Sequence, residues 1–236
     1  RHTRYIGDWS SDVCSSDLST ESHYQSSTTG GSLSGNAVDA WRGQYNGNLS
    51  WTHGYLDLRG SPNQSRDAAS VRTAGRFDKW RYDLSRQQPI TSTLTGVVSW
   101  SGQGSNKNLD SSEKFILGGD AAVRAYPAGE GAGAQGQLLT LELRWALTST
   151  MTWAGFYDQG RVRLLHDPLS PTALNDYTIR GSGLAWLIQG PSGARFRMTW
   201  ARRMGANPNP TLTGNDQDGS LIKNRYGMTA SIPFAL

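Results

Sequence analysis

The sequence surrounds one arginine with glycines in the stretch 118–136, "GGDAAVRAYPAGEGAGAQG", where Arg124 is the single cation. Further on, the alternation of "MTWAGFYDQG" puts Phe156 and Asp158 on one face and Trp153 on the other. A guanidinium pairs with a carboxylate through two parallel hydrogen bonds, and its plane can stack on an aromatic ring. Because a glycine-rich tether is flexible, Arg124 can reach the face that carries Asp158. These residues predict a clamp that holds a loop against a strand.

The same stretch does not predict a nucleotide site, although residues 131–136, "GAGAQG", formally fit G-x-G-x-x-G. A dinucleotide site needs a helix after the glycines, and here the alternating run "TLELRWAL" follows. The sequence has no paired inward carboxylates and no supported Ser-His-Asp order, and His23, His53 and His166 lack metal-ligand spacing. We therefore predict no catalytic residues, no metal and no cofactor.

Simpler interpretations of the clamp residues stay open at this point. Arg124 is also consistent with a solvated loop arginine. Asp158 is also consistent with a turn that contains Gly160, because Asp-x-Gly is common turn chemistry. Glu142 and Arg144 are interpreted as ordinary lining of a polar interior and not as part of a site.

Alternating hydrophobicity indicates strands along most of the chain. In residues 139–147, leucines and a tryptophan share one face, while Thr, Glu and Arg occupy the other. Residues 194–200 repeat the pattern with Phe, Met and Trp opposite Arg and Thr. These segments run about nine to twelve residues, close to the length that a tilted membrane strand needs. The large apolar faces favour a membrane β-barrel over a soluble sandwich.

The composition is compatible with either class of all-β protein. The chain has 236 residues, 28 glycines, nine tryptophans and nine tyrosines, with a mean hydropathy of -0.55. Low hydropathy does not exclude a barrel, because only every second residue faces lipid. A carbohydrate-binding sandwich would also explain the aromatic residues. The formal net charge is +4, but Lys and Arg are scattered, so nucleic-acid binding is not predicted.

The first residues differ in character from the rest of the chain. Residues 1–18, "RHTRYIGDWSSDVCSSDL", resemble the translation of a sequencing adapter, so we assign residues 19–236 to the protein itself. The single cysteine, Cys14, lies in the excluded part. Residues 19–40 read as a loop or as the remnant of a strand, and residues 109–115 as one helical turn.

The last segment, "YGMTASIPFAL", alternates to the end of the chain and carries Tyr226, Met228, Ile232 and Phe234 on one face. This pattern resembles the terminal strand of outer-membrane barrels, which the barrel-assembly machinery reads. Such strands usually end on an aromatic residue, whereas Leu236 ends this one. Truncation of the sequence at this end is the alternative.

The segment "SSEKFILGGDAAVRAYPAGEGAGAQG" resembles the signature of two-partner secretion transporters of the haemolysin secretion/activation type. A strand with "GFYDQG" follows, and then "GSGLAW" at 181–186, in the order of that family. The family has Gly after the motif arginine, where this chain has Ala125. The motif residues are Gly118, Gly119, Val123, Arg124 and Tyr126 on the loop, and Phe156, Asp158 and Gly160 on the strand.

The resemblance implies an all-β fold, an antiparallel transmembrane β-barrel of the outer-membrane assembly-factor superfamily. This chain would supply its C-terminal part, an incomplete barrel of about eight strands with an inward-folding loop at about 118–136. It also implies a location in the Gram-negative outer membrane, in contact with lipid. The implied partner is an unfolded exoprotein cargo of the haemolysin, adhesin or contact-dependent toxin type, which also meets periplasmic POTRA domains that this sequence lacks. The alternatives are an assembly factor of the same superfamily and a passive porin-like or adhesin barrel.

Overall fold

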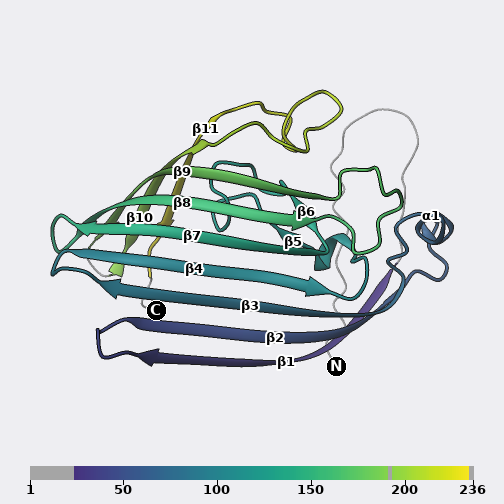
Figure 1. Cartoon of the computed structure of the whole chain (residues 1–236), viewed down its shortest axis with the longest axis horizontal. Coiled ribbons are helices and arrows are strands. Elements are labelled where there is room, and N and C mark those ends of the chain that lie inside the picture. The colour runs from purple at the N-terminus through teal and green to yellow at the C-terminus, as the bar shows by residue number, and fades with distance from the viewer. Residues whose placement is uncertain (1–23, 191–192, 234–236) are drawn as a thin grey trace.

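The computed structural model describes residues 24–190 and 193–233 of the chain. It contains one nine-stranded sheet in the order β1-β2-β3-β4-β7-β8-β9-β10-β11, with neighbouring strands antiparallel (Figure 1). The strands are β1 (Gln25–Val38), β2 (Gln44–Asp57), β3 (Gly75–Pro89), β4 (Leu94–Ser105), β7 (Gln135–Ala146), β8 (Met151–Arg163), β9 (Asp176–Gln189), β10 (Arg195–Arg203) and β11 (Asn224–Ser231).

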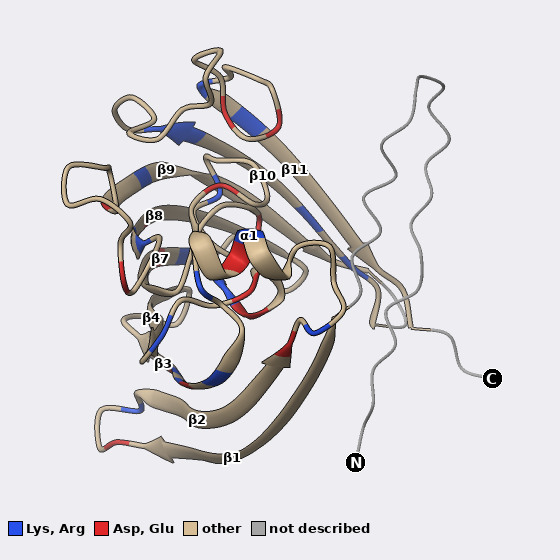
Figure 2. Cartoon of the chain, turned by 90° about the vertical axis from the view of Figure 1, so that its right-hand side faces the viewer, with Lys and Arg blue, Asp and Glu red and all other residues tan. Residues whose placement is uncertain are grey.

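The sheet curves into an open trough, with loops gathered on its concave side (Figure 2). Large apolar side chains such as Leu141 and Trp145 are exposed on the convex face. On the opposite face of β8, Phe156 and Asp158 are buried. The period of two in the sequence therefore separates an apolar exterior from a covered interior, as predicted.

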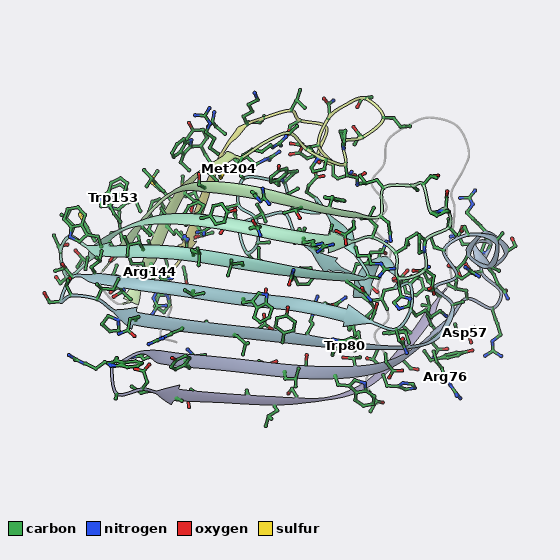
Figure 3. The ribbon with its side chains drawn as sticks, in the orientation of Figure 1. Asp57, Arg76, Trp80, Arg144, Trp153 and Met204 are labelled. Carbon is green, nitrogen blue, oxygen red and sulfur yellow. The ribbon has the colours of Figure 1, made fainter. Side chains whose placement is uncertain are left out.

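Three tryptophans form a row across the convex face. Trp145, Trp153 and Trp186 lie directly opposite one another on β7, β8 and β9. The rings of Trp153 and Trp186 stack with centroids 5.9 Å apart. Figure 3 shows Trp153 near one end of the strands, away from Asp57 and Arg76 at the other end. A row of this kind is typical of the aromatic belt at a membrane interface.

The connections differ sharply between the two ends of the sheet. Short turns join β1 to β2, β3 to β4, β7 to β8 and β9 to β10, while long loops join the other consecutive strands. Outer-membrane strands show the same asymmetry, with short periplasmic turns and longer extracellular loops. We call the two ends the short-turn end and the long-loop end.

The long loops carry the remaining elements. The short helix α1 (Gln64–Ala69) lies between β2 and β3. The loop after β4 contains a 3-10 turn, η1 (Ser111–Glu113), and a small hairpin of β5 (Phe115–Ile116) and β6 (Ala132–Gly133). No helix in the described ranges has the length and apolarity that a membrane crossing requires.

Two parts of the fold differ from the sequence-based expectation. Residues 25–38 form a full strand that pairs with β2 along its whole length, so the sheet has nine strands and not about eight. Most of these residues are Ser, Thr or Gly, which give no hydrophobic pattern in the sequence. The strand is ordered by backbone pairing with β2. Helix α1 is the second, since its six residues are too few to show a helical period in the sequence.

The final strand is shorter than expected. β11 ends at Ser231, and Ile232 and Pro233 lie beyond it. Ser231 pairs with Arg195, the first residue of β10, and Pro233 has no N–H with which to extend the ladder. Phe234, residues 1–18 and His23 lie outside the described residues.

The single curved sheet rules out the soluble sandwich, which needs two packed sheets. The sheet is open, because β1 and β11 each have one neighbour in the described part of the chain. An open edge exposes unpaired N–H and C=O groups, which are costly in hydrocarbon. Both edges therefore need further strands or each other to complete a barrel wall.

A charge placed on the convex face should destabilise the protein according to its depth in the membrane. Leu141 lies inside the apolar band of β7, while Leu147 lies at the short-turn end, and both are exposed. We expect Leu141→Arg to lower the free energy of unfolding in lipid vesicles by about 2–4 kcal/mol, and Leu147→Arg by less than about 1 kcal/mol. Urea titration measures both values. Equal losses would contradict the assignment of this face to lipid.

Candidate functional site

The glycine-rich segment folds into the trough as a loop closed at its base by the β5–β6 hairpin. We call residues 117–131, between β5 and β6, the inward loop. Its base continues the hairpin, because the Leu117 and Gly118 N–H groups donate to the carbonyls of Gly131 and Glu130. The loop is thus shorter than the predicted range 118–136, whose last residues already belong to β7.

Both predicted glycines at the start of the inward loop have a structural reason. A Cβ on Gly118 would fall 2.7 Å from the Glu130 Cβ, so the two limbs of the loop approach too closely for a side chain. Gly119 has a φ of 110°, which side chains disfavour. These positions let the chain reverse so that Val123, Arg124 and Tyr126, all buried, face the sheet.

The inner wall offers small residues where the inward loop lies against it. A Cβ on Gly160 would meet the Leu117 and Val123 side chains, and a Cβ on Gly181 would lie 2.5 Å from the Ala125 Cβ. Gly181 pairs directly with Asp158 across β8 and β9. The two glycines therefore leave space on the wall, and this space lets the inward loop pack against the sheet beside Asp158.

Ala125 occupies this space without backbone strain. Its φ is not positive, because Arg42 and Arg72 are the non-glycine residues with positive φ in the described chain. Ala125 is fully buried against Gly181. The departure from the family's glycine therefore affects packing and not the backbone conformation.

Arg124 contacts Asp158 through three hydrogen bonds. Its Nε and Nη2 donate to Oδ2 and Oδ1 of Asp158, both over 2.8 Å, and its backbone N–H donates to Oδ2 over 3.2 Å. The guanidinium carbon lies 3.3 Å from the centroid of the Phe156 ring. The ring in turn lies over Gly183, the residue opposite Phe156 on β9. This is the bidentate, stacked geometry that suits arginine and not lysine.

A second carboxylate extends the pair into a cluster. Nη1 of Arg124 donates to Oε2 of Glu142 over 3.1 Å, and Nε of Arg144 donates to Oε1 over 2.7 Å. Arg197 on β10 approaches Oε2 of Glu142 at 3.5 Å. Thr140 donates to Oδ1 of Asp158 over 3.1 Å. Three strands thus converge on the tip of one loop.

The cluster is almost closed to solvent. The Arg124 and Glu142 side chains are 6% and 5% exposed, and Asp158 is fully buried. Burial alone would lower the pKa of the Arg124 guanidinium, but its hydrogen bonds and attraction to Asp158 and Glu142 outweigh burial and raise it. Arg124 therefore stays charged inside the trough.

Tyr126 also points into the covered interior. It is 1% exposed, and the Arg203 guanidinium carbon lies 4.4 Å from its ring centroid. Burial raises the pKa of Tyr126 to about 12, and the nearby Arg203 opposes this only in part. Tyr126 therefore stays neutral and packs in the interior with a cation on the face of its ring.

Glu142 takes a part in the site that its sequence pattern did not indicate. The alternation predicts ordinary lining at Glu142 and Arg144, but Glu142 bridges Arg124 and Arg144. The alternation of β7 indicated the correct face for Glu142. The missing information was the register, which sets Glu142 opposite Phe156 and Thr140 opposite Asp158.

The described residues contain no group of three or more His, Cys, Asp or Glu able to hold a metal.

The family model described as haemolysin secretion/activation protein ShlB/FhaC/HecB matches residues 17–185, which include the inward loop and β8. The chain belongs to this family. It is accordingly an outer-membrane protein, and its sheet is part of an outer-membrane β-barrel.

Individual relatives are similar over part of their length. The heme/hemopexin transporter protein HuxB of Haemophilus influenzae is 28% identical over 116 residues, 48% of this chain and 20% of that protein. The outer membrane transporter CdiB of Dickeya dadantii (strain 3937) is 30% identical over 101 residues, 43% of this chain and 17% of that protein. The structure of CdiB from Escherichia coli matches with a TM-score of 0.59 and 22% identity, over 77% of this chain and 33% of that chain.

The contact between Ala125 and Gly181 can be tested by exchanging which of the two residues carries the methyl group. Gly181→Ala places two methyl groups in one space, so we expect the barrel to lose about 1–3 kcal/mol of stability. Adding Ala125→Gly should restore most of the loss, because it moves the methyl group from the loop to the wall. The melting of the folded barrel in semi-native electrophoresis measures both.

Gly155→Ala is the matched control, because it lies on the lipid-facing side of β8. Its new Cβ would meet Leu184 at an ordinary 3.9 Å. A loss in Gly181→Ala that Ala125→Gly fails to reduce would contradict this packing.

Proposed function

We propose that the chain forms part of the wall and the inner loop of an outer-membrane pore that secretes a large unfolded exoprotein. The observation that carries the proposal is the buried Arg124–Asp158 pair, which fastens the inward loop to the inner wall. Membership of the haemolysin secretion/activation family supports it. The relatives named as transporters support transport as the activity, and not catalysis.

A polar space beside the inward loop supports passage through the interior. A cavity of about 470 Å³ lies between the tip of the loop and the wall of β2, β3 and β4. Its lining includes the polar side chains Asn48, Asp83, Ser101 and Asp120. Hydroxyl, amide and carboxylate groups keep such a wall hydrated, so an unfolded chain meets water and not an apolar surface.

The proposed cargo is an exoprotein of the haemolysin, adhesin or contact-dependent toxin type, and its folding outside the cell is the proposed energy source. POTRA domains elsewhere in the full transporter are its proposed first contact. We further propose that the barrel-assembly machinery reads the terminal strand at Tyr226, Met228, Ile232 and Phe234.

Two other functions remain as alternatives with distinct expectations. A passive porin needs no contact between Arg124 and Asp158, so their three hydrogen bonds argue against it. An assembly factor of the same superfamily is compatible with the same loop. It predicts that loss of the protein lowers the amounts of other outer-membrane barrels, whereas a secretion pore predicts loss of one exoprotein.

Removal of either clamp partner should abolish most secretion. Breaking a buried pair leaves an unpaired charge and costs about 3–5 kcal/mol, enough to release the inward loop from the wall. We expect Arg124→Ala and Asp158→Ala in the full-length transporter to reduce secreted cargo at least roughly tenfold at an equal level of folded barrel. Immunodetection of cargo in the medium and of barrel in the membrane gives both quantities.

The ion pair of Arg161 and Asp176 provides the control. It joins β8, the strand that carries Asp158, to β9, but its side chains are 59% and 41% exposed. Exposed pairs contribute little, so Arg161→Ala and Asp176→Ala should secrete like the wild type. Normal export by both clamp variants would refute the proposal. A fall in other barrel proteins with normal export would favour the assembly factor.

A further inference from the structure

A second buried polar cluster lies on the return limb of the inward loop, away from the clamp. Glu130 is fully buried. Its Oε1 accepts a hydrogen bond from Nδ2 of Asn207 over 3.0 Å, and its Oε2 accepts one from the backbone N–H of Gln217 over 3.0 Å. Both donors belong to residues 204–223, the loop between β10 and β11, which we call the last loop.

The partners of Glu130 are themselves fixed within the last loop. The Asn207 amide also donates to Oδ1 of Asp216 over 2.9 Å, so one side chain bridges two carboxylates. Its own oxygen accepts from the Asn209 N–H over 3.0 Å. Asp216 is fully buried and pairs with Arg203. All the hydrogen-bonding groups of the Asn207 amide are therefore used.

Arg203 joins this cluster to the tip of the inward loop. It pairs with Asp216 and lies over the buried ring of Tyr126. Arg225 at the start of β11 adds a bond to Asp218 over 2.9 Å and a longer contact with Asp216. The last loop is thus held by cations of β10 and β11. On the inward loop, Glu130 contacts the last loop and Tyr126 contacts Arg203.

A buried carboxylate is costly unless donors satisfy it. In the described chain, the donors to the Glu130 carboxylate come from the last loop and not from the inward loop. Neither loop can therefore shift within the covered interior without leaving a buried charge or buried donors unsatisfied. Because the tip of the inward loop is fixed to β8 through Arg124, the inward loop has two separate attachments.

We propose that Glu130 is a latch that binds the last loop to the inward loop, so that the two loops move as one body. The latch goes beyond the secretion role, because it concerns the coupling of two loops and not the passage of cargo. Any partner that displaces the last loop at the long-loop end would then act directly on the inward loop. The contact consists of hydrogen bonds from two neutral N–H donors to a charged carboxylate. It can therefore reform after opening without a covalent step.

Hydrogen–deuterium exchange on the full-length transporter in nanodiscs tests the latch. The Gln217 N–H is the probe, because its acceptor is the Glu130 carboxylate. We expect exchange at Gln217 to become at least roughly tenfold faster in Glu130→Ala and in Asn207→Ala. Glu130→Gln, which keeps one acceptor oxygen, should recover part of the lost protection.

Two controls separate the latch from general effects. Asp120→Ala removes the same charge from the exposed part of the inward loop, and Asn215→Ala removes an amide of the last loop whose side chain makes no hydrogen bond in the described structure. Both should exchange like the wild type at Gln217.

Unchanged exchange at Gln217 in Glu130→Ala, or an equal increase in Asp120→Ala, would overturn the latch. If Glu130→Ala does not fold, Asn207→Ala decides the matter from the side of the last loop. Normal secretion by Arg124→Ala and Asp158→Ala, with exchange at Gln217 behaving as expected, would count against the clamp alone, so the two proposals fail separately.

Discussion

The fold is organised around one buried ion pair, between Arg124 on a loop and Asp158 on the inner wall. Two charges removed from water gain little net stability, because desolvation offsets their attraction. Their value lies in fixing one arrangement, since either charge left alone would be far more costly. The Phe156 ring and the Glu142 carboxylate complete the surroundings of the guanidinium. The pair therefore determines where the inward loop lies.

The pair can form because the sheet reserves space for it. Every strand alternates, so each residue of β8 and β9 faces either the apolar exterior or the interior. On the interior face, Gly181 and Gly183 lie opposite Asp158 and Phe156 and admit the Ala125 methyl group and the aromatic ring. Elsewhere the wall is polar, along β2 to β4. The interior is thus divided between a packed side and a polar side.

The sequence was sufficient for the faces and for the clamp, because a period of two assigns each side chain to a side. The residues Arg124, Phe156 and Asp158 also have complementary chemistry, a guanidinium with a carboxylate and an aromatic ring. The sequence could not supply the register between strands, which brings Glu142 to Arg124. Nor could it predict the bonds of Glu130, which join residues 77 and 87 positions apart. Contacts of that kind depend on how two loops fold over one sheet.

A double-mutant cycle on the free energy of unfolding in lipid vesicles tests most directly whether Arg124 and Asp158 act as one unit. Urea titration of Arg124→Ala, Asp158→Ala and the double variant gives the coupling. We predict that each single change costs about 3–5 kcal/mol, and that the double change costs no more than the worse single change. Losses that simply add would mean that the two side chains do not interact, and would contradict the central claim.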